Sequence, residues 1–398
     1  MINLPSFAKI NLGLKIGPRR ADGFHELRTV YQTLALHDVI RVEALPGAGI
    51  EIRCDDPRVP CDESNTCYKA AERVLAAIPQ AEHSASAGKS QIPRLRPSGS
   101  ARDDNQNEGP PIGAAEAAPL RPHVAVRRDH GPLRRHTSQE HGKIIIEIEK
   151  RLPVQGGMGA ASSNAVTTML GMERALGIEL APAEKLRIAA EVGSDLPLFL
   201  MGGTVLGVGR GEEVYPLPDL PVVSVVVITP AVGVSTPKAF ARWDEIVARA
   251  AGAPEVGTAR WDAALTASGA AGTISEFGER VFTWLGNKFP QALGPASGVP
   301  AAGGDRAETP LLDLVRAGIE NDFERVVFPE YPELREVKEL LLRGGAQYAS
   351  LSGSGSTVYG LFASAAEAQQ AAERMSAAGH TAVATTTLTR AEYWQAFR

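Results

Sequence analysis

The hydrophobic positions of this chain follow a period of two residues in some segments and a helical period of about 3.6 in others, which together predict an α+β fold. In the first half, these patterns predict strands at 6–15, 26–36, 38–45, 49–54 and 143–152, and helices at about 66–78, at about 161–176 and from Pro182 onward. In the second half, they predict strands at 222–229, 347–352, 357–362 and 381–388, and helices near 237–251, 310–320, 332–343 and 364–378. The pattern restarts after Gly211, so we predict two domains, 1–210 and 211–398.

One segment, at about residues 81–142, departs from both periods and is rich in Pro, Arg, Ser, Gly, Asn and His. Such a segment buries too little apolar surface to offset its conformational entropy, so we predict a disordered insertion there. Its basic, histidine-rich composition leaves RNA or metal binding open as an alternative. A solvated surface loop is favoured, because the cost of closing a loop rises only slowly with its length. A shorter insertion is predicted at 294–310.

Composition and charge restrict the class of protein. The formal net charge is −5 and the sequence pI is near 6.0, which argues against a general nucleic-acid-binding protein, because such proteins carry a strongly basic face. The three cysteines show no metal-ligand spacing and are predicted to be reduced thiols. Lys9 and Lys15 interrupt the apolar N-terminal pattern, and prolines interrupt the apolar run at 220–237. We therefore expect a soluble, cytoplasmic protein without a signal peptide or a membrane span.

A glycine-rich segment at 152–164 (LPVQGGMGAASSN) follows a predicted strand and precedes a predicted helix. Small residues let backbone N–H groups approach an anion, and the helix N-terminus adds a partial positive charge, so the pattern is typical of a phosphate-binding loop. Ser162 and Ser163 are expected to cap the helix and to donate hydrogen bonds to phosphate oxygens. Taken alone, the pattern is as typical of a tight turn with ordinary serine caps.

Three better-known nucleotide-binding motifs are excluded. Residues 88–90 (GKS) resemble the end of a Walker loop, but His83 stands where the first glycine belongs. Residues 253–255 (APE) match a protein-kinase triplet, but no HRD or DFG motif precedes them. Residues 157–162 have the spacing of a dinucleotide fingerprint, but the expected second strand with its acidic residue does not follow.

Three further segments place polar residues where they could carry chemistry. Lys9 and Asn11 share one face of the first predicted strand, opposite an apolar face, although a solvated polar face would have the same pattern. Asp195 follows a helix and precedes an apolar stretch, so it is either a base in a cleft or a helix N-cap. Residues 350–358 (SLSGSGSTV) form a second loop of small residues between two strands. Each of these signals is weak by itself.

In their order along the chain, these segments resemble the GHMP kinase superfamily. The matching strings are FAKINLGLKIGPRRADGFHELRTVYQTL, LPVQGGMGAASSNAV, VGSDLPLFLMGGTVLGVGRGE, STPKAF (235–240) and LSGSGSTVYGLF, and they cover nearly the whole chain except the two insertions. The resemblance implies a two-domain α+β fold, with a ribosomal-protein-like N-terminal α/β domain and a ferredoxin-like C-terminal α/β domain. It also implies an ATP-dependent kinase of small hydroxyl-bearing metabolites. Within the superfamily, the chain is similar to members that phosphorylate the 2-hydroxyl of 4-diphosphocytidyl-2-C-methyl-D-erythritol in the non-mevalonate isoprenoid precursor pathway.

The resemblance implies roles for the residues that catalyse the reaction and bind ATP. Asp195 would be the base for the substrate hydroxyl, and Lys9 would orient that hydroxyl and offset charge near the transferred phosphoryl group. Mg²⁺ would accompany ATP, and no metal ligand stands out. The implied ATP-binding residues are Asn65 near the adenine, and Pro153, Val154, Gln155, Gly156, Gly157, Met158, Gly159, Ala160, Ala161, Ser162 and Ser163 around the phosphates.

The resemblance also implies a pocket for the cytidine part of the substrate. Phe24 and Phe240 would stack on the cytosine, and His25 would hydrogen-bond its edge. Asn11 and Thr236 would also contact the substrate. The implied partner is this cytidine-diphosphate-linked small molecule, with no nucleic acid and no membrane.

Three other functions stay open on the sequence alone. The nearest is another GHMP kinase, of the mevalonate or homoserine type, although those enzymes lack the RADGFHEL segment and its distal STPKAF partner. A nicotinamide-dependent oxidoreductase built on residues 157–162 would bind NAD tightly and would not bind ATP. A non-catalytic nucleotide-binding or RNA-associated protein would use the basic insertion, but it would have no need of Lys9 and Asp195.

Overall fold

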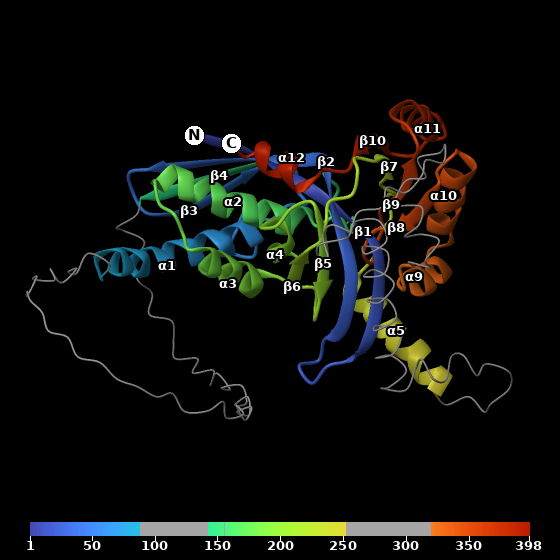
Figure 1. Cartoon of the computed structure of the whole chain (residues 1–398), viewed down its shortest axis with the longest axis horizontal. Coiled ribbons are helices and arrows are strands. Elements are labelled where there is room, and N and C mark those ends of the chain that lie inside the picture. Colours follow the sequence, from blue (N-terminus) through green and yellow to red (C-terminus); the bar gives the residue numbers. More distant parts are fainter. Residues whose placement is uncertain (88–141, 155, 252–319) are drawn as a thin grey trace, which may run out of the picture. The chain divides into compact units, whose positions relative to one another are not determined.

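The computed structural model describes residues 1–87, 142–154, 156–251 and 320–398, drawn in colour in Figure 1. The described parts of Met1–Ile78 and Ser138–Arg398 belong to one compact unit, and a second unit, Pro79–Thr137, is described only at its first residues. The shorter insertion predicted at 294–310, the helix predicted at 310–320 and Gln155 lie outside the described residues. The longer predicted insertion begins inside a helix, and its residues 88–141 also lie outside them.

The first half of the chain forms a six-stranded mixed sheet. Its strands are β1 (Ile2–Arg19), β2 (His25–Leu45), β3 (Gly49–Cys54), β4 (Lys143–Glu149), β5 (Thr204–Val208) and β6 (Glu213–Pro216). Their order is β3-β4-β2-β5-β6, and β1 pairs with β2 beside this path. Strands β3 and β4 run parallel, whereas the other pairs are antiparallel.

Strands β1 and β2 form a long hairpin that carries much of the later site. The register places Asn11 opposite Tyr31 and Lys9 opposite Thr33, so these side chains come from neighbouring positions of one sheet. The strands predicted at 26–36 and 38–45 are one continuous strand, because His37 and Asp38 stay paired with Phe7 and Ser6 of β1.

Four helices accompany this sheet. They are α1 (Thr66–Ala87), α2 (Ala160–Leu176), α3 (Pro182–Val192) and the short α4 (Leu196–Phe199). Helix α2 packs against β1 and β2, and its buried Met169 and Val166 join the isoleucines of β4 in one hydrophobic core. Burial of this apolar stripe stabilises α2, because each buried large side chain contributes roughly 1.5–3 kcal/mol.

The second half forms a four-stranded antiparallel sheet in the order β10-β7-β9-β8. Its strands are β7 (Ser224–Ile228), β8 (Tyr348–Leu351), β9 (Val358–Phe362) and β10 (Ala382–Thr386). The described helices of this half are α5 (Thr236–Ala251), α9 (Glu324–Glu330), α10 (Pro332–Arg343), α11 (Ala365–Ala377) and α12 (Arg390–Gln395). Helices α10 and α11 pack on this sheet, as Figure 1 shows.

The hairpin β1–β2 reaches both sheets. Leu14 and Ile16 of β1 belong to the core of the four-stranded sheet, and isolated bridges join Leu14 to Asn321 and Leu34 to Thr387. The six-stranded sheet ends with β6 and the four-stranded sheet begins with β7. The division into 1–210 and 211–398 stays a prediction.

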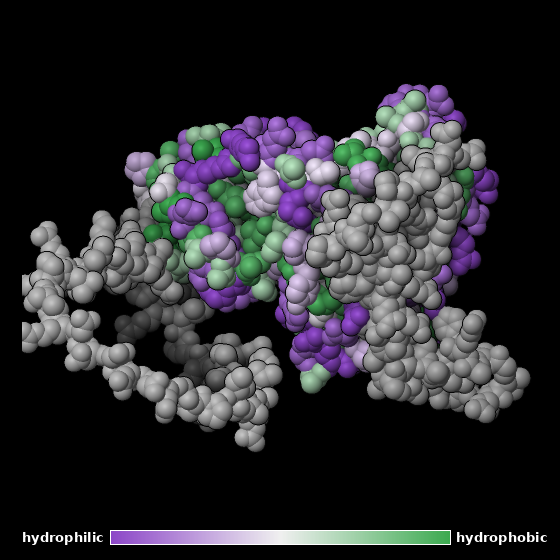
Figure 2. All heavy atoms as spheres, viewed as in Figure 1, coloured by the Kyte–Doolittle hydropathy of each residue, from purple (hydrophilic) through white to green (hydrophobic). Residues whose placement is uncertain are grey.

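The predicted elements that fall on described residues are confirmed to within a few residues at their ends, except that β2 is continuous and α1 extends to Ala87. Strands β5 and β6 and helices α4, α9 and α12 were not predicted. In Figure 2, hydrophilic residues predominate at the visible end of the β1–β2 hairpin. Within the described ranges, no helix is both long enough and apolar enough to cross a membrane.

Candidate active site

The glycine-rich loop between β4 and α2 separates two cavities. One cavity, of about 370 Å³, lies beside the start of α1, and the other, of about 600 Å³, lies beside the β1–β2 hairpin and α5. Gly157 and Gly159 line both cavities. A molecule bound in either cavity would therefore lie against this loop.

Asp38 of β2 holds the two ends of the loop together. Its carboxylate accepts hydrogen bonds from the backbone N–H groups of Arg151 and Leu152, each at 2.7 Å, where the loop begins. It also accepts from Nδ2 of Asn164 at 3.0 Å, inside α2, and from Nζ of Lys150 at 2.7 Å. A buried carboxylate needs such partners to offset the cost of removing it from water. The loop ends are thus anchored before any ligand binds.

The glycines of the loop are required by their surroundings. Gly157 has φ +77°, and a Cβ there would lie 2.2 Å from the carbonyl oxygen of Ser352. Gly159 has φ +68° and is the N-cap of α2, and a Cβ there would lie 3.1 Å from Cγ of Lys9. Both positions favour glycine because side chains rarely adopt this left-handed conformation. The loop can therefore lie close to the lysine and to the 352–357 loop.

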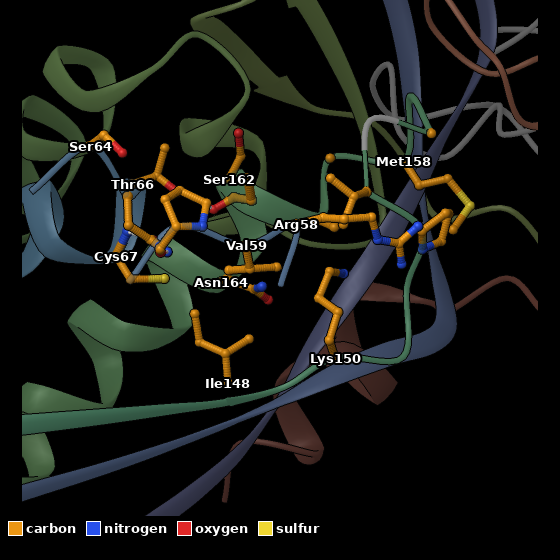
Figure 3. Close-up of a pocket in the computed structure, with 18 of the residues that line it drawn as sticks. Arg58, Val59, Ser64, Thr66, Cys67, Ile148, Lys150, Met158, Ser162 and Asn164 are labelled. Atoms are coloured by element: carbon orange, nitrogen blue, oxygen red, sulfur yellow. Dashed lines mark hydrogen bonds between the residues drawn. The ribbon is translucent and has the colours of Figure 1, made fainter. Parts of the chain in front are cut away.

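The first cavity has the features of a nucleotide-binding site. It is lined by the loop, by the first turn of α2 and by the residues that precede α1, as Figure 3 shows. Arg58 and Lys150 lie toward one end in that view, and Thr66 and Cys67 toward the other. The backbone N–H groups of the first turn of α2 have no partners within the helix, which makes this turn suited to phosphate oxygens.

The predicted ATP-binding residues are largely brought together. All of those on described residues line the first cavity except Ser163, whose buried hydroxyl instead accepts a hydrogen bond from Ser6 at 2.9 Å. The prediction that Ser162 and Ser163 cap the helix is wrong, because α2 begins at Ala160 and Gly159 is its N-cap. Asn65 is a cap of a different helix: its Oδ1 accepts a hydrogen bond of 2.8 Å from the N–H of Cys67 at the start of α1.

Lys9 and Asp195 meet where the loop separates the cavities. Nζ of Lys9 lies 3.5 Å from Oδ2 of Asp195 and donates a hydrogen bond of 2.8 Å to Oδ1 of Asn11. The lysine is only 3% exposed, whereas the aspartate side chain is 34% exposed and borders the second cavity. Asp195 occupies the N-cap position of α4, but its side chain makes no capping hydrogen bond to this helix and is directed to Lys9 and Tyr31 instead.

Tyr31 completes this cluster, although its role was not predicted from the sequence. Its hydroxyl donates to Oδ1 of Asp195 at 3.3 Å, and Nζ of Lys9 lies 5.3 Å from the centroid of its ring. Burial, together with the negative charge of Asp195, raises the pKa of Tyr31 well above its ordinary value. Tyr31 is therefore a neutral donor to the carboxylate. Tyr31 could have been found only from the pairing of β1 with β2, which places it opposite Asn11.

The second cavity gathers the residues predicted to bind the cytidine. Phe24, His25, Thr236 and Phe240 line it together with Asn11. The imidazole of His25 stacks on Phe240, with ring centroids 4.9 Å apart and planes at 9°. Phe24 is 52% exposed, so its ring is open to a ligand. The guanidinium of Arg210, a residue not predicted from the sequence, lies 4.9 Å from the centroid of the Phe24 ring.

The second loop of small residues braces the first. The N–H of Thr357 donates to the carbonyl of Gly156 at 3.1 Å, and the hydroxyl of Ser352 donates to the carbonyl of Gly157 at 3.0 Å. The hydroxyls of Thr236 and Ser354 are 2.7 Å apart at the second cavity. The 352–357 loop therefore holds the glycine loop in place. In the described part of the chain, no group of three or more His, Cys, Asp or Glu residues is arranged to bind a metal ion.

Comparison with known proteins identifies this arrangement. The model of the GHMP kinases N terminal domain matches residues 125–203, and the model named GHMP kinases C terminal matches residues 308–381. The chain belongs to the GHMP kinases. It is accordingly an ATP-dependent kinase of small molecules, and the predicted two-domain class of fold is confirmed. The kinase family also excludes the nicotinamide-dependent alternative.

Several relatives of this GHMP kinase share one name. The 4-diphosphocytidyl-2-C-methyl-D-erythritol kinase of Acaryochloris marina is 29% identical over 93% of this chain and 90% of its own length. The enzyme of that name from Solibacter usitatus is 28% identical over 90% of this chain and 81% of its own length. A crystal structure of 4-(cytidine 5'-diphospho)-2C-methyl-D-erythritol kinase has the same fold, with a TM-score of 0.57 and 22% identity over 97% of this chain and 99% of that chain.

Proposed function

We propose that this GHMP kinase transfers the terminal phosphoryl group of ATP to the 2-hydroxyl of 4-diphosphocytidyl-2-C-methyl-D-erythritol, in the non-mevalonate isoprenoid precursor pathway. The observation that carries the proposal is the Lys9–Asp195 pair, with 3.5 Å between Nζ and Oδ2, at the junction of two cavities that share one glycine loop. The names of the relatives support the choice of substrate. A cytoplasmic location stays a prediction.

Asp195 is the proposed base. Its carboxylate borders the second cavity and is exposed enough to reach a hydroxyl there. Phosphoryl transfer depends on positioning and on charge neutralisation more than on covalent chemistry. Asp195 would accept the proton of the attacking hydroxyl, while Lys9 offsets the charge that develops on the phosphoryl oxygens. Tyr31 would hold the carboxylate in position through its hydrogen bond at 3.3 Å.

ATP fits the first cavity by the chemistry of its lining. The adenine would lie among apolar side chains such as Val59 and Ile148, and the phosphates would lie against the loop and the N-terminus of α2. The charges of Arg58 and Lys150 are matched by Asp56 and Asp38. Backbone N–H groups would therefore provide most of the phosphate contacts.

Mg²⁺ is expected to enter with ATP. This ion is usually held by substrate phosphates, water and one or two carboxylates. We assign the ion no protein ligand. Bound in this way, Mg²⁺ would neutralise phosphate charge during transfer.

The second cavity supports a cytidine substrate over the mevalonate or homoserine alternative. Its volume of about 600 Å³ and its two phenylalanines suit a base with an attached diphosphate. Mevalonate and homoserine are small aliphatic molecules, and neither has a flat ring that could stack on these phenylalanines. Phe24 and Phe240 would provide stacking surfaces, and His25 would lie at the base edge.

An ADP-release assay tests the proposal, with the cytidyl substrate, its uridine analogue, mevalonate and homoserine as acceptors. We expect turnover of the cytidyl substrate, a several-fold lower kcat/KM for the uridine analogue, and no turnover of the other two. The expected selectivity follows from the mispairing of buried hydrogen-bonding groups, which costs roughly 1–3 kcal/mol. Turnover of mevalonate or homoserine in place of the cytidyl substrate would show that the enzyme is a different GHMP kinase.

A further inference from the structure

His25 has a partner to which the proposed function assigns no role. Nε2 of His25, at the start of β2, lies 2.7 Å from Oδ1 of Asp244 in α5. The histidine side chain is 7% exposed, and both residues line the second cavity. Among the described residues, His25 is the only hydrogen-bond partner of the Asp244 carboxylate. This contact joins two segments that are 219 positions apart in the sequence.

The contact determines which ring nitrogen carries the proton. An ionised carboxylate can only accept hydrogen bonds, so Nε2 must be the donor. In a neutral imidazole the other nitrogen, Nδ1, is then an acceptor. Nδ1 has no hydrogen-bond partner among the residues that the structure describes, although the ring lines the cavity. It is therefore the ring atom that is available to a ligand, and it accepts.

The stacking geometry leaves room for a base beside the histidine. The ring centroids of His25 and Phe240 are 4.9 Å apart and the planes are nearly parallel, at 9°. Touching rings are separated by only about 3.5–4.0 Å, so the two rings are offset and part of the Phe240 face stays uncovered. A base that hydrogen-bonds to the imidazole edge lies in the imidazole plane. Such a base shares the face of Phe240 with His25.

We propose that Asp244 determines the base selectivity of the second cavity by fixing the proton of His25 on Nε2, so that Nδ1 accepts a hydrogen bond from the exocyclic amino group of cytosine. Uracil has a carbonyl oxygen at that position, which would face the acceptor Nδ1 without a proton between them. The proposal rests on the proposed function for its choice of ligand. Asp244 acts through His25 and is a positioning residue.

A purely structural role for Asp244 predicts different behaviour. If the carboxylate only attached α5 to the hairpin, its loss would weaken the binding of cytidine and uridine ligands equally. The ratio of the affinity for cytidine ligands to the affinity for uridine ligands distinguishes the two roles. A general loss of binding in the cavity lowers both affinities and therefore cancels in this ratio. The neighbouring Glu245 offers a matched control, since it lies on the same helix but pairs with Arg242 and Arg249 and does not line the cavity.

The test measures the affinity of full-length protein for cytidine 5'-diphosphate and uridine 5'-diphosphate by calorimetry. We expect Asp244→Ala to lower the cytidine preference about five- to tenfold, as the loss of one correctly paired buried group implies. His25→Ala should lower it equally, and Asp244→Ala should have no further effect in the His25→Ala protein. Asp244→Glu should restore part of the preference, and Glu245→Ala should leave it unchanged. An unchanged preference in Asp244→Ala, or no preference in the wild type, would overturn the proposal.

The nitrogen-15 chemical shifts of the His25 ring give a second measurement that needs no ligand and no variant to fold. We expect wild-type protein to carry a single ring proton, on Nε2. A proton on Nδ1, or on both nitrogens, would overturn the proposal.

The binding experiment is independent of turnover. A base preference that depends on Asp244 would therefore stand even if the cytidyl substrate were not phosphorylated, and such a result would contradict only the proposed function.

Discussion

The two cavities on either side of Gly157 and Gly159 are built in different ways. The first is lined by two stretches of sequence, 58–67 and 148–164. The second is lined by side chains from the hairpin, from residues 194–195, from α5 and from the 352–357 loop, which are spread over most of the chain. The first cavity thus takes its lining from two segments, whereas the second takes its lining from segments spread over most of the chain.

Their charges differ in the same way. The cations that line the first cavity already have carboxylate partners in Asp56 and Asp38. The second cavity contains two acid–base pairs, Lys9 with Asp195 and His25 with Asp244, whose carboxylates are at least one-third exposed. The first cavity is therefore suited to hold a ligand by shape and backbone contacts. The second is suited to proton transfer and recognition by side chains, so substitutions in the two should affect different kinetic constants.

The largest effect is expected in the second cavity, at Asp195. Asp195→Asn keeps the size of the side chain but removes the proton acceptor, and Lys9→Met keeps the stem but removes the charge. General-base catalysis typically contributes about 10²–10⁴-fold, so we expect kcat to fall by that order in Asp195→Asn. The affinity for ATP should change little in either variant. Steady-state kinetics and ATP titration test this separation.

Two results would contradict it. An Asp195→Asn protein that folds and keeps kcat within about tenfold of the wild type would show that the carboxylate is not the base, because that loss is below the usual range. A large loss of ATP affinity in the same variant would show that the two cavities are not functionally separate. Circular dichroism of each variant excludes misfolding as the cause.

A smaller effect, on the other kinetic constant, is expected at the loop. Gly157→Ala would place a Cβ 2.2 Å from the carbonyl oxygen of Ser352, in addition to the cost of φ +77°. The loop must shift away from its brace, and we expect the KM for ATP to rise roughly tenfold, which corresponds to about 1.4 kcal/mol. Gly177→Ala is the matched control, because Gly177 has φ +65° but no heavy atom within 4 Å of an added Cβ. Equal effects in the two variants would assign the loss to backbone strain.

The contrast between the cavities also explains how much the sequence alone could predict. The glycine loop is predictable because its residues are consecutive and lie between a strongly periodic strand and a helix. Lys9 and Asn11 are predictable as neighbours on one strand face. The serine caps were predicted incorrectly, because the side-chain pattern does not show that the left-handed Gly159 begins the helix.

The other contacts depend on pairings between distant segments. Tyr31 joins the site through the register of β1 and β2, and irregularities near Gly13 shift that register. Asp38 receives donors from more than 110 positions away, and Asp244 meets His25 from 219 positions away. Strands β5 and β6 were missed because β5 contains Gly207 and β6 ends at Pro216, and glycine and proline are both depleted in strands. None of these contacts leaves a local signal in the sequence.

The smallest effect concerns the thiols near the first cavity. Cys67 lines that cavity, and its burial raises the pKa of its thiol to about 12. A raised pKa favours the neutral thiol, and only the thiolate is the nucleophile in alkylation, so Cys67 should be unreactive at a pH near its ordinary value of 9. Cys54 is partly buried and its pKa is also raised by burial, so it should react slowly. Cys61 is exposed and should react first.

Treatment of the folded enzyme with iodoacetamide, followed by mass spectrometry of its peptides, tests this order. Because the Cys61 side chain does not line the cavity, we expect its alkylation to leave the KM for ATP unchanged. Cys67 should be modified only after denaturation. Rapid modification of Cys67 in the folded enzyme would show that the first cavity opens in solution. Small reagents would then reach the apolar wall of the first cavity directly. The first cavity could then no longer be described as a preformed nucleotide site, in contrast to the second cavity, which is assembled from distant segments.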